Sequence, residues 1–217
     1  MFDPAVYATP SAPEFAVSFR NVWASVARPG ATWTGEERVA IARIGRIARE
    51  KAAGSPESML DVGLPPPVIQ ASAVLGGDPG RVRLPWVKAL NEAGLSPEGY
   101  VEIVSIVSRV TVVDTFHRSL GLPLIELPDP ESGDPSGEVD ARARTNSRAF
   151  APTVGPPMIP TALSAIPAEM AAMADIQDTM YMTGDDMADP DFQRDGLHRT
   201  QIELVAARTS RINECFY

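Results

Sequence analysis

Proline is the feature that most limits how this chain can fold. The sequence has 21 prolines among 217 residues, about twice the usual frequency of roughly 5%. Because proline lacks a backbone N–H and its ring clashes with the preceding turn, it is rarely found inside a helix or a central strand. The regular elements must therefore fit into the segments between the prolines.

Apolar residues recur at helical spacing within those segments. Spacings of three and four residues predict helices over 15–27, 36–53, 84–93, 98–120 and 168–182, a short helix from Pro67 and a weaker one over 139–150. Segment 98–120 is rich in Val and Ile, which favour strands, but its length is unusual for a strand. The sequence therefore predicts an all-α fold.

Two of the helix starts share a pattern. Thr34 to Glu37 and Thr200 to Glu203 each have the spacing of a capping box, in which threonine and glutamate satisfy each other's backbone amides. Similar residues follow each box, which predicts two tandem helical modules, although chance recurrence of a common cap is an alternative. The acidic, Pro- and Gly-rich segment 127–138 is typical of a linker. We expect a first module at 1–126 and a second, incomplete one at 139–217.

Composition excludes several classes of function. The chain has 19 basic and 28 acidic residues and a net charge of −9, which argues against a nucleic-acid-binding protein. We expect no membrane segment, because no apolar run approaches 18 residues, and a cytoplasmic location, because the start lacks a signal-peptide pattern. Cys215 is the one cysteine, which excludes an internal disulfide and a multi-thiolate zinc site.

The remaining residues with chemical potential have ordinary structural explanations. His117 and His198 have no partners at metal-ligand spacing, so we expect surface or core histidines and no bound metal. The methionines at 170–182 are predicted to fill a core or a subunit contact. A solvent-exposed helix face is expected to carry Arg43, Arg46 and Arg49.

One segment has a more specific pattern. Glu203 is followed by Cys215 twelve positions later, and the segment 203–217 resembles the central helix of the alkylhydroperoxidase D-like family, which shares its fold with carboxymuconolactone decarboxylases. The family pattern continues with a second cysteine three positions after the first, and then a histidine. Residues 86–123 resemble the helices that follow such a core. Arg49 stands where the first module would need its cysteine, and the given sequence stops at Tyr217, one position before the place where the pattern has its second cysteine.

The resemblance implies an antiparallel helical bundle that acts as a thiol-dependent peroxide reductase. In that chemistry a thiolate attacks the peroxide, the resulting sulfenic acid condenses with a neighbouring thiol, and a dithiol reductant restores the site. The resemblance assigns proton transfer to Glu203 and the role of disulfide partner to Cys215. It implies no cofactor, and assembly into trimers or hexamers. Asn213 is expected to cap a new helix with Cys215 in its first turn, where free amides favour a thiolate.

Two other functions stay open. A cofactor-free lyase of the carboxymuconolactone decarboxylase branch would need a buried acid–base pair facing a pocket. A non-catalytic helical module for subunit assembly would use the apolar surface that an incomplete module exposes. In either case Glu203 could be only the capping-box residue of its helix.

Overall fold

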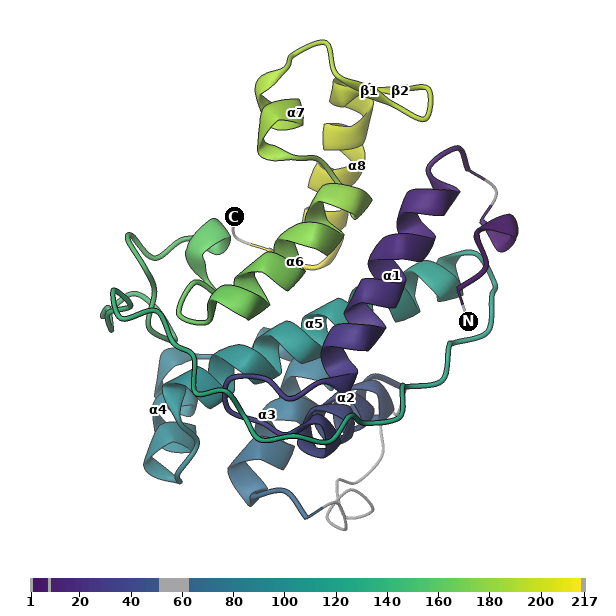
Figure 1. Cartoon of the computed structure of the whole chain (residues 1–217). Helices are drawn as coiled ribbons and strands as arrows, with labels where there is room; N and C mark the ends of the chain where they lie inside the picture. The colour runs from purple at the N-terminus through teal and green to yellow at the C-terminus, as the bar shows by residue number, and fades with distance from the viewer. Residues whose placement is uncertain (1, 8, 51–62, 216–217) are drawn as a thin grey trace.

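The computed structural model describes residues 2–7, 9–50 and 63–215. These residues confirm the all-α prediction (Figure 1). The helices are α1 (Ala12–Ala27), α2 (Gly35–Glu50), α3 (Pro66–Gly77), α4 (Leu84–Glu92), α5 (Pro97–Ser119), α6 (Pro167–Met180), α7 (Gly184–Ala188) and α8 (Arg199–Ile212). A short antiparallel hairpin of β1 (Gln193–Arg194) and β2 (Leu197–His198) precedes α8. Within the described ranges, no helix is both long and apolar enough to cross a bilayer.

Helix α5 is the central element of the fold. It begins where the sequence predicts, because the Ser96 hydroxyl accepts a hydrogen bond from the Gly99 amide at 3.0 Å and Pro97 occupies the first turn. Helices α1, α2, α3 and α6 all pack against it (Figure 1). Its fully buried Ile103 and Ile106 lie in the main hydrophobic core. The Val/Ile-rich segment is therefore a helix, and packing on several sides explains its apolar composition.

Helices α2 and α3 approach each other closely at a pair of glycines. A Cβ atom on Gly76 would overlap the backbone of Gly45, so glycine at this position permits the contact. Helix α3 continues through Gly77, and a short 3-10 helix at Pro79–Arg81 follows it. At the start of α2, the predicted capping box is confirmed: the Thr34 amide donates to Glu37 Oε2 at 2.9 Å, and the Glu37 amide donates to Thr34 Oγ1 at 3.3 Å.

The acidic segment 127–138 has no helix or strand, as predicted, but it is fastened to the body of the protein. Its backbone amides at Glu131, Ser136 and Gly137 donate to the carbonyls of Ala27, Gly30 and Ala31 at 2.8, 2.8 and 2.9 Å. Beyond it, α6 packs on α1 and α5 and adds Ile176 to the core of the first five helices. The division into modules 1–126 and 139–217 stays a prediction.

The weak helix expected at 139–150 is wrong. Residues 139–150 form turns, with an isolated bridge between Arg144 and Thr153. The side chains of Asp140 and Asn146 accept from the amides two residues later, at 2.8 and 2.9 Å. Such local bonds compete with the helical ladder.

The second predicted capping box is also wrong. Helix α8 begins two residues earlier, with His198 as its N-cap and Gln201 Oε1 accepting from the His198 amide at 2.9 Å. Thr200 and Glu203 therefore lie inside the helix. Helix α8 has no buried residue, whereas α2 buries one face, so the two proposed repeats differ in packing.

The methionines at 170–182 and His117 occupy structural positions. Met173 and Met180 pack against the core and Met182 is fully buried, which confirms the core interpretation. His117 is buried, with Nε2 at 2.9 Å from the Tyr7 hydroxyl and Nδ1 at 2.9 Å from the Pro123 carbonyl.

Candidate functional site

The structure places Cys215 just past the end of α8. Asn213 is the C-cap of this helix and not the N-cap of a new one, and the Cys215 amide donates to the Ser210 carbonyl at 3.0 Å. The side chain is exposed. The C-terminal end of a helix presents free carbonyl groups and not free amides. The free amides expected around Cys215 at a helix start are therefore not found at this end of α8.

Glu203 lies in the first half of the same helix and contacts other residues. Its Oε2 accepts from the Tyr181 hydroxyl at 2.9 Å, and Oε1 lies 3.8 Å from Arg199. About 10 Å of helix separates Glu203 from Ser210, the residue that the Cys215 backbone contacts. The structure therefore does not bring the carboxylate and the thiol together, and their catalytic roles stay predictions. The capping-only alternative for Glu203 is excluded because Gln201 occupies that position.

No group of three His, Cys, Asp or Glu side chains within the described ranges could hold a metal ion. His198 is accounted for as the N-cap of α8.

The predicted exposed arginine face is wrong in one respect. Arg46 is half-buried and forms a bidentate pair with Asp114 of α5 at 2.7 and 2.8 Å, whereas Arg43 and Arg49 are exposed.

A cluster of four buried charged side chains joins three helices. Arg38 comes from α2, Glu102 and Arg109 come from α5, and Glu169 comes from α6, and each is at most 3% exposed. Arg38 contacts Glu102, and its Nη1 lies 2.9 Å from Glu169 Oε1. Arg109 Nη2 donates to Glu169 Oε2 at 2.6 Å. Opposite charges alternate along this buried ion cluster, so each ion is paired.

Backbone and hydroxyl groups form further hydrogen bonds with the buried ion cluster. The Thr32 amide donates to Glu102 Oε2 at 2.8 Å, Arg38 donates to the Ser25 carbonyl at 3.1 Å, and Arg109 donates to the Ser105 hydroxyl at 3.1 Å. Gly30 is required beside the cluster, because a Cβ atom there would overlap both Glu102 and Arg38. The turn between α1 and α2 is therefore fitted around these charges.

Burial and neighbouring charges act in opposite directions on the two carboxylates. Burial raises the pKa of Glu102, and the attraction of Arg38 offsets this only in part. Burial also opposes ionisation of Glu169, but Arg109 and Arg38 together outweigh it and hold its pKa below the usual value. Glu169 lies between two guanidinium groups, whereas Glu102 contacts one. Glu169 is thus the better-stabilised anion of the pair.

The predictions from the sequence did not include this cluster. Its signal was the presence of Glu102 and Arg109 within an apolar segment, seven residues apart and therefore on one helix face. The four charges are shielded from solvent, and none of them lines a cavity described below. The cluster can hold helices in place, but it offers no open side to a solute.

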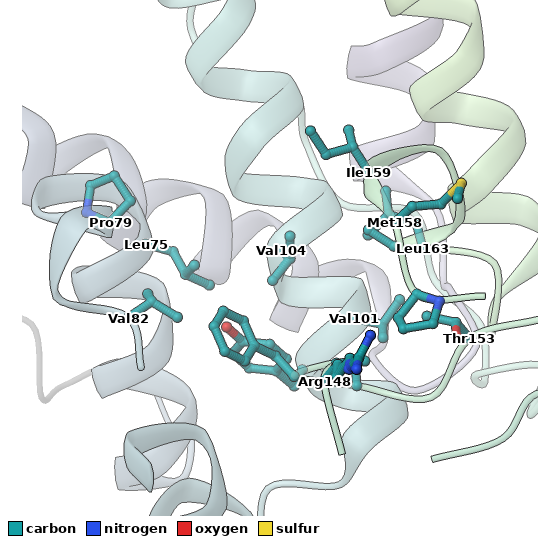
Figure 2. A pocket seen from close by; sticks show the side chains of 16 residues that line it. Leu75, Pro79, Val82, Val101, Val104, Arg148, Thr153, Met158, Ile159 and Leu163 are labelled. Carbon is teal, nitrogen blue, oxygen red and sulfur yellow. The ribbon is translucent and has the colours of Figure 1, made fainter. Parts of the chain in front are cut away.

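A separate cavity of about 550 Å³ lies between α3, the first half of α5 and the segment 148–163. Figure 2 shows Leu75, Pro79 and Val82 on one side and Met158, Ile159 and Leu163 on the other, with Val104 of α5 between them. Most of the lining side chains are apolar. Its lining residues with polar side chains are Tyr100, Arg148 and Thr153.

The three polar side chains differ in what they contact. Thr153 donates its hydroxyl to the Gly155 carbonyl at 3.1 Å. Tyr100 is only 3% exposed, yet its hydroxyl has no hydrogen-bond partner among the described residues. Burial raises the pKa of Tyr100 to about 12, so the hydroxyl stays protonated at neutral pH. Arg148 is exposed and lines the cavity (Figure 2).

The cavity and the buried ion cluster use different faces of α5. Tyr100, Val101 and Val104 line the cavity, whereas Glu102 and Arg109 enter the cluster. One helix therefore supplies both a ligand-sized hollow and the charged anchor beside it. No protein-family model, curated protein or solved structure matches this chain.

Proposed function

We propose that this protein binds a small apolar molecule in the cavity between α3, α5 and the segment 148–163. The observation that carries the proposal is the cavity itself, with about 550 Å³ of space, walls of apolar side chains and few polar groups. Ligand sites in proteins have this size and composition.

The rim of the cavity supports the proposal. Phe150, Met158 and Ile159 line it and are 46%, 46% and 63% exposed. Burying apolar surface stabilises a complex by roughly 25 cal/mol per Å². A bound apolar molecule would cover these side chains, which otherwise form an exposed apolar patch.

The wall formed by α5 is held in place before any ligand arrives. Val101 and Leu163 line the cavity and belong to a small apolar cluster with Ile166. The neighbouring residues Glu102 and Glu169 are fixed by the buried ion cluster. A preformed wall reduces the ordering cost of binding.

Filling the cavity from its accessible side tests this function. Ala162 lines the cavity and is exposed, so Ala162→Trp can occupy it with little effect on the core. Ala168 is exposed in the first turn of α6 and lines no part of the cavity, so Ala168→Trp is the matched control. Calorimetric titration with decanamide should show binding to the wild type and Ala168→Trp, and at least about tenfold weaker binding to Ala162→Trp. Equal binding to all three proteins, or no binding to the wild type, would contradict the proposal.

Thiol-dependent peroxide reduction, which the family resemblance implies, is a second proposal. The exposure of Cys215 supports it, because an external thiol can reach the sulfur. With a single cysteine, Cys215 would have to attack the peroxide itself, in place of the disulfide-partner role that the resemblance assigns to it; its thiolate would take one peroxide oxygen as sulfenic acid and release an alcohol. An external dithiol would then reduce the sulfenic acid, forming water and its own disulfide. Such a cycle suits a reducing compartment such as the cytoplasm.

Peroxide consumption in the presence of dithiothreitol tests this second proposal. The wild type should consume peroxide faster than Cys215→Ser. Glu203→Gln should retain most of the activity, because the structure separates this carboxylate from Cys215. Equal rates for the wild type and Cys215→Ser would remove the support for a peroxidase.

The lyase and the subunit-assembly module are the other two alternatives, and the structure supports only the second of them as a proposal. The lyase needs an acid–base pair facing a pocket, but the ionisable side chains lining the cavity are Tyr100 and Arg148, and neither is a carboxylate or an imidazole that could serve as the base. We therefore do not propose it. Self-association into trimers or hexamers stays a proposal, supported by Leu204, Val205 and Ile212 of α8, which are 70%, 63% and 66% exposed.

A further inference from the structure

We infer that the ligand of the cavity is a monocarboxylate with an apolar body, whose carboxylate is bound by the Tyr100 hydroxyl and the Arg148 guanidinium. This inference rests on the proposed function, because it names the class of molecule that the cavity takes.

Tyr100 supplies the first observation. A buried hydroxyl normally has a hydrogen-bond partner; among the described residues, the hydroxyls of Tyr7 and Tyr181 are hydrogen-bonded, whereas that of Tyr100 takes part in none of the side-chain hydrogen bonds. Arg38 Nε is the one side-chain nitrogen or oxygen in those ranges that is both unpaired and sealed from solvent. Tyr100 is otherwise buried, and the cavity is a space that it lines. Its hydroxyl is a donor awaiting an acceptor from the ligand.

Arg148 supplies the second observation. It is the one charged residue among those that line the cavity, in a chain whose net charge is −9. Its side chain forms no ion pair within the described part of the chain. A guanidinium group presents two parallel donors that match the two oxygens of a carboxylate. An anionic head group therefore has a charge partner here.

The rest of the lining sets the body of the ligand and its total charge. Away from Arg148 the walls are formed by Leu75, Val82, Val104 and Leu163 (Figure 2). A second carboxylate would lie against these side chains without a partner, and burying an unpaired charge is costly. The site therefore favours one charge at one end of an apolar molecule.

Two probes with the same alkyl chain and different head groups test the inference. Decanoate is ionised at pH 7, whereas decanamide is neutral, and both head groups accept a hydrogen bond. Calorimetric titration of the wild type should show binding of both, with decanoate bound about tenfold more tightly, which corresponds to one charge-assisted contact at a half-open site. Arg148→Gln should remove most of this preference.

Two further variants separate the roles of the head-group contacts. Arg211→Gln removes the same charge from α8, where no residue lines the cavity, and should keep the tenfold preference. Tyr100→Phe should weaken both probes by a few-fold, because it removes a donor that serves either head group. Loss of preference in Arg211→Gln would assign the effect to net charge and overturn the role of Arg148.

The outcomes distinguish failure of the inference from failure of the proposed function. If the wild type binds both probes equally, or prefers decanamide, the carboxylate assignment is wrong and the apolar site remains. If Arg148→Gln keeps the full preference for decanoate, Arg148 is not the charge partner and the inference also fails. If neither probe binds, the cavity is not a ligand site and both ideas fall.

Discussion

Replacing Glu169 with glutamine should destabilise the fold more than any comparable surface change. Glu169 is 3% exposed and accepts from Arg109 at 2.6 Å, with Arg38 at 2.9 Å from its other oxygen. In Glu169→Gln, the two buried guanidinium groups share the one remaining carboxylate, Glu102. The variant therefore carries an uncompensated positive charge in a region closed to water.

The size of the effect follows from that burial. Breaking a buried ion pair from one side costs roughly 3–5 kcal/mol. Glutamine keeps one carbonyl acceptor, so we expect the lower end, about 3 kcal/mol. For a chain of this length, each kcal/mol lowers Tm by roughly 2–4 °C. The expected loss is therefore about 6–12 °C.

Urea denaturation followed by circular dichroism measures the free energy of unfolding directly. Glu50 pairs with Arg118 at 3.1 Å, but 46% of its side-chain surface is exposed, so Glu50→Gln is the matched control and should cost at most about 1 kcal/mol. The reasoning would be refuted if Glu169→Gln cost no more than this control. It would also fail if Arg109→Met combined with Glu169→Leu cost as much as Glu169→Gln alone, because replacing both partners removes the unpaired charge.

Three further changes probe the same region. The pKa of Glu169 lies below its usual value, so its stabilising contribution is present above the pKa of the unfolded chain and is lost as pH falls through the folded pKa. The difference in the free energy of unfolding between the wild type and Glu169→Gln, measured by urea denaturation, should therefore be largest near neutral pH and should shrink below about pH 4. A difference that stays constant with pH would contradict the assignment. Burial raises the pKa of Glu102, whereas the pKa of Glu169 is lowered, so the carboxylate of Glu102 is the less stabilised anion and Glu102→Gln should cost less than Glu169→Gln in the same assay; the reverse order would reject the stated pKa directions. Gly30→Ala, which would overlap Glu102 and Arg38, should lower the free energy of unfolding by roughly 1–3 kcal/mol, whereas Gly184→Ala, whose new Cβ meets nothing within 4 Å, should change it by no more than about 0.5 kcal/mol.

Local signals predicted the helices well because the residues that determine them are near in sequence. Ser96 and Pro97 start α5, Gly94 ends the turn before it with a φ of +102°, and Thr34 with Glu37 starts α2. The predictions failed where a different local bond competed. His198 and Gln201 capped α8 ahead of the expected Thr200 box, and Asp140 closed a turn in a segment with weak helical spacing.

The sites were harder to predict because their residues come from distant segments. Arg38, Glu102 and Glu169 are separated by more than 60 residues at each step, and nothing in their local sequences shows that they meet. The cavity likewise depends on how segment 148–163 lies against α3 and α5. Cys215 and Glu203 were predicted as site residues from their spacing in the sequence, and their joint role in catalysis stays a prediction.

The way the acidic segment 127–138 is attached has a consequence for how its sequence can vary. The bonds to the turn after α1 come from main-chain amides of Glu131, Ser136 and Gly137, so most side chains there can be exchanged without releasing it. The number of residues between those amides is another matter, because one insertion or deletion would shift every donor away from its carbonyl. Relatives of this chain should therefore show many substitutions and few changes of length in this segment, with glycine retained at 137, where φ is +68°.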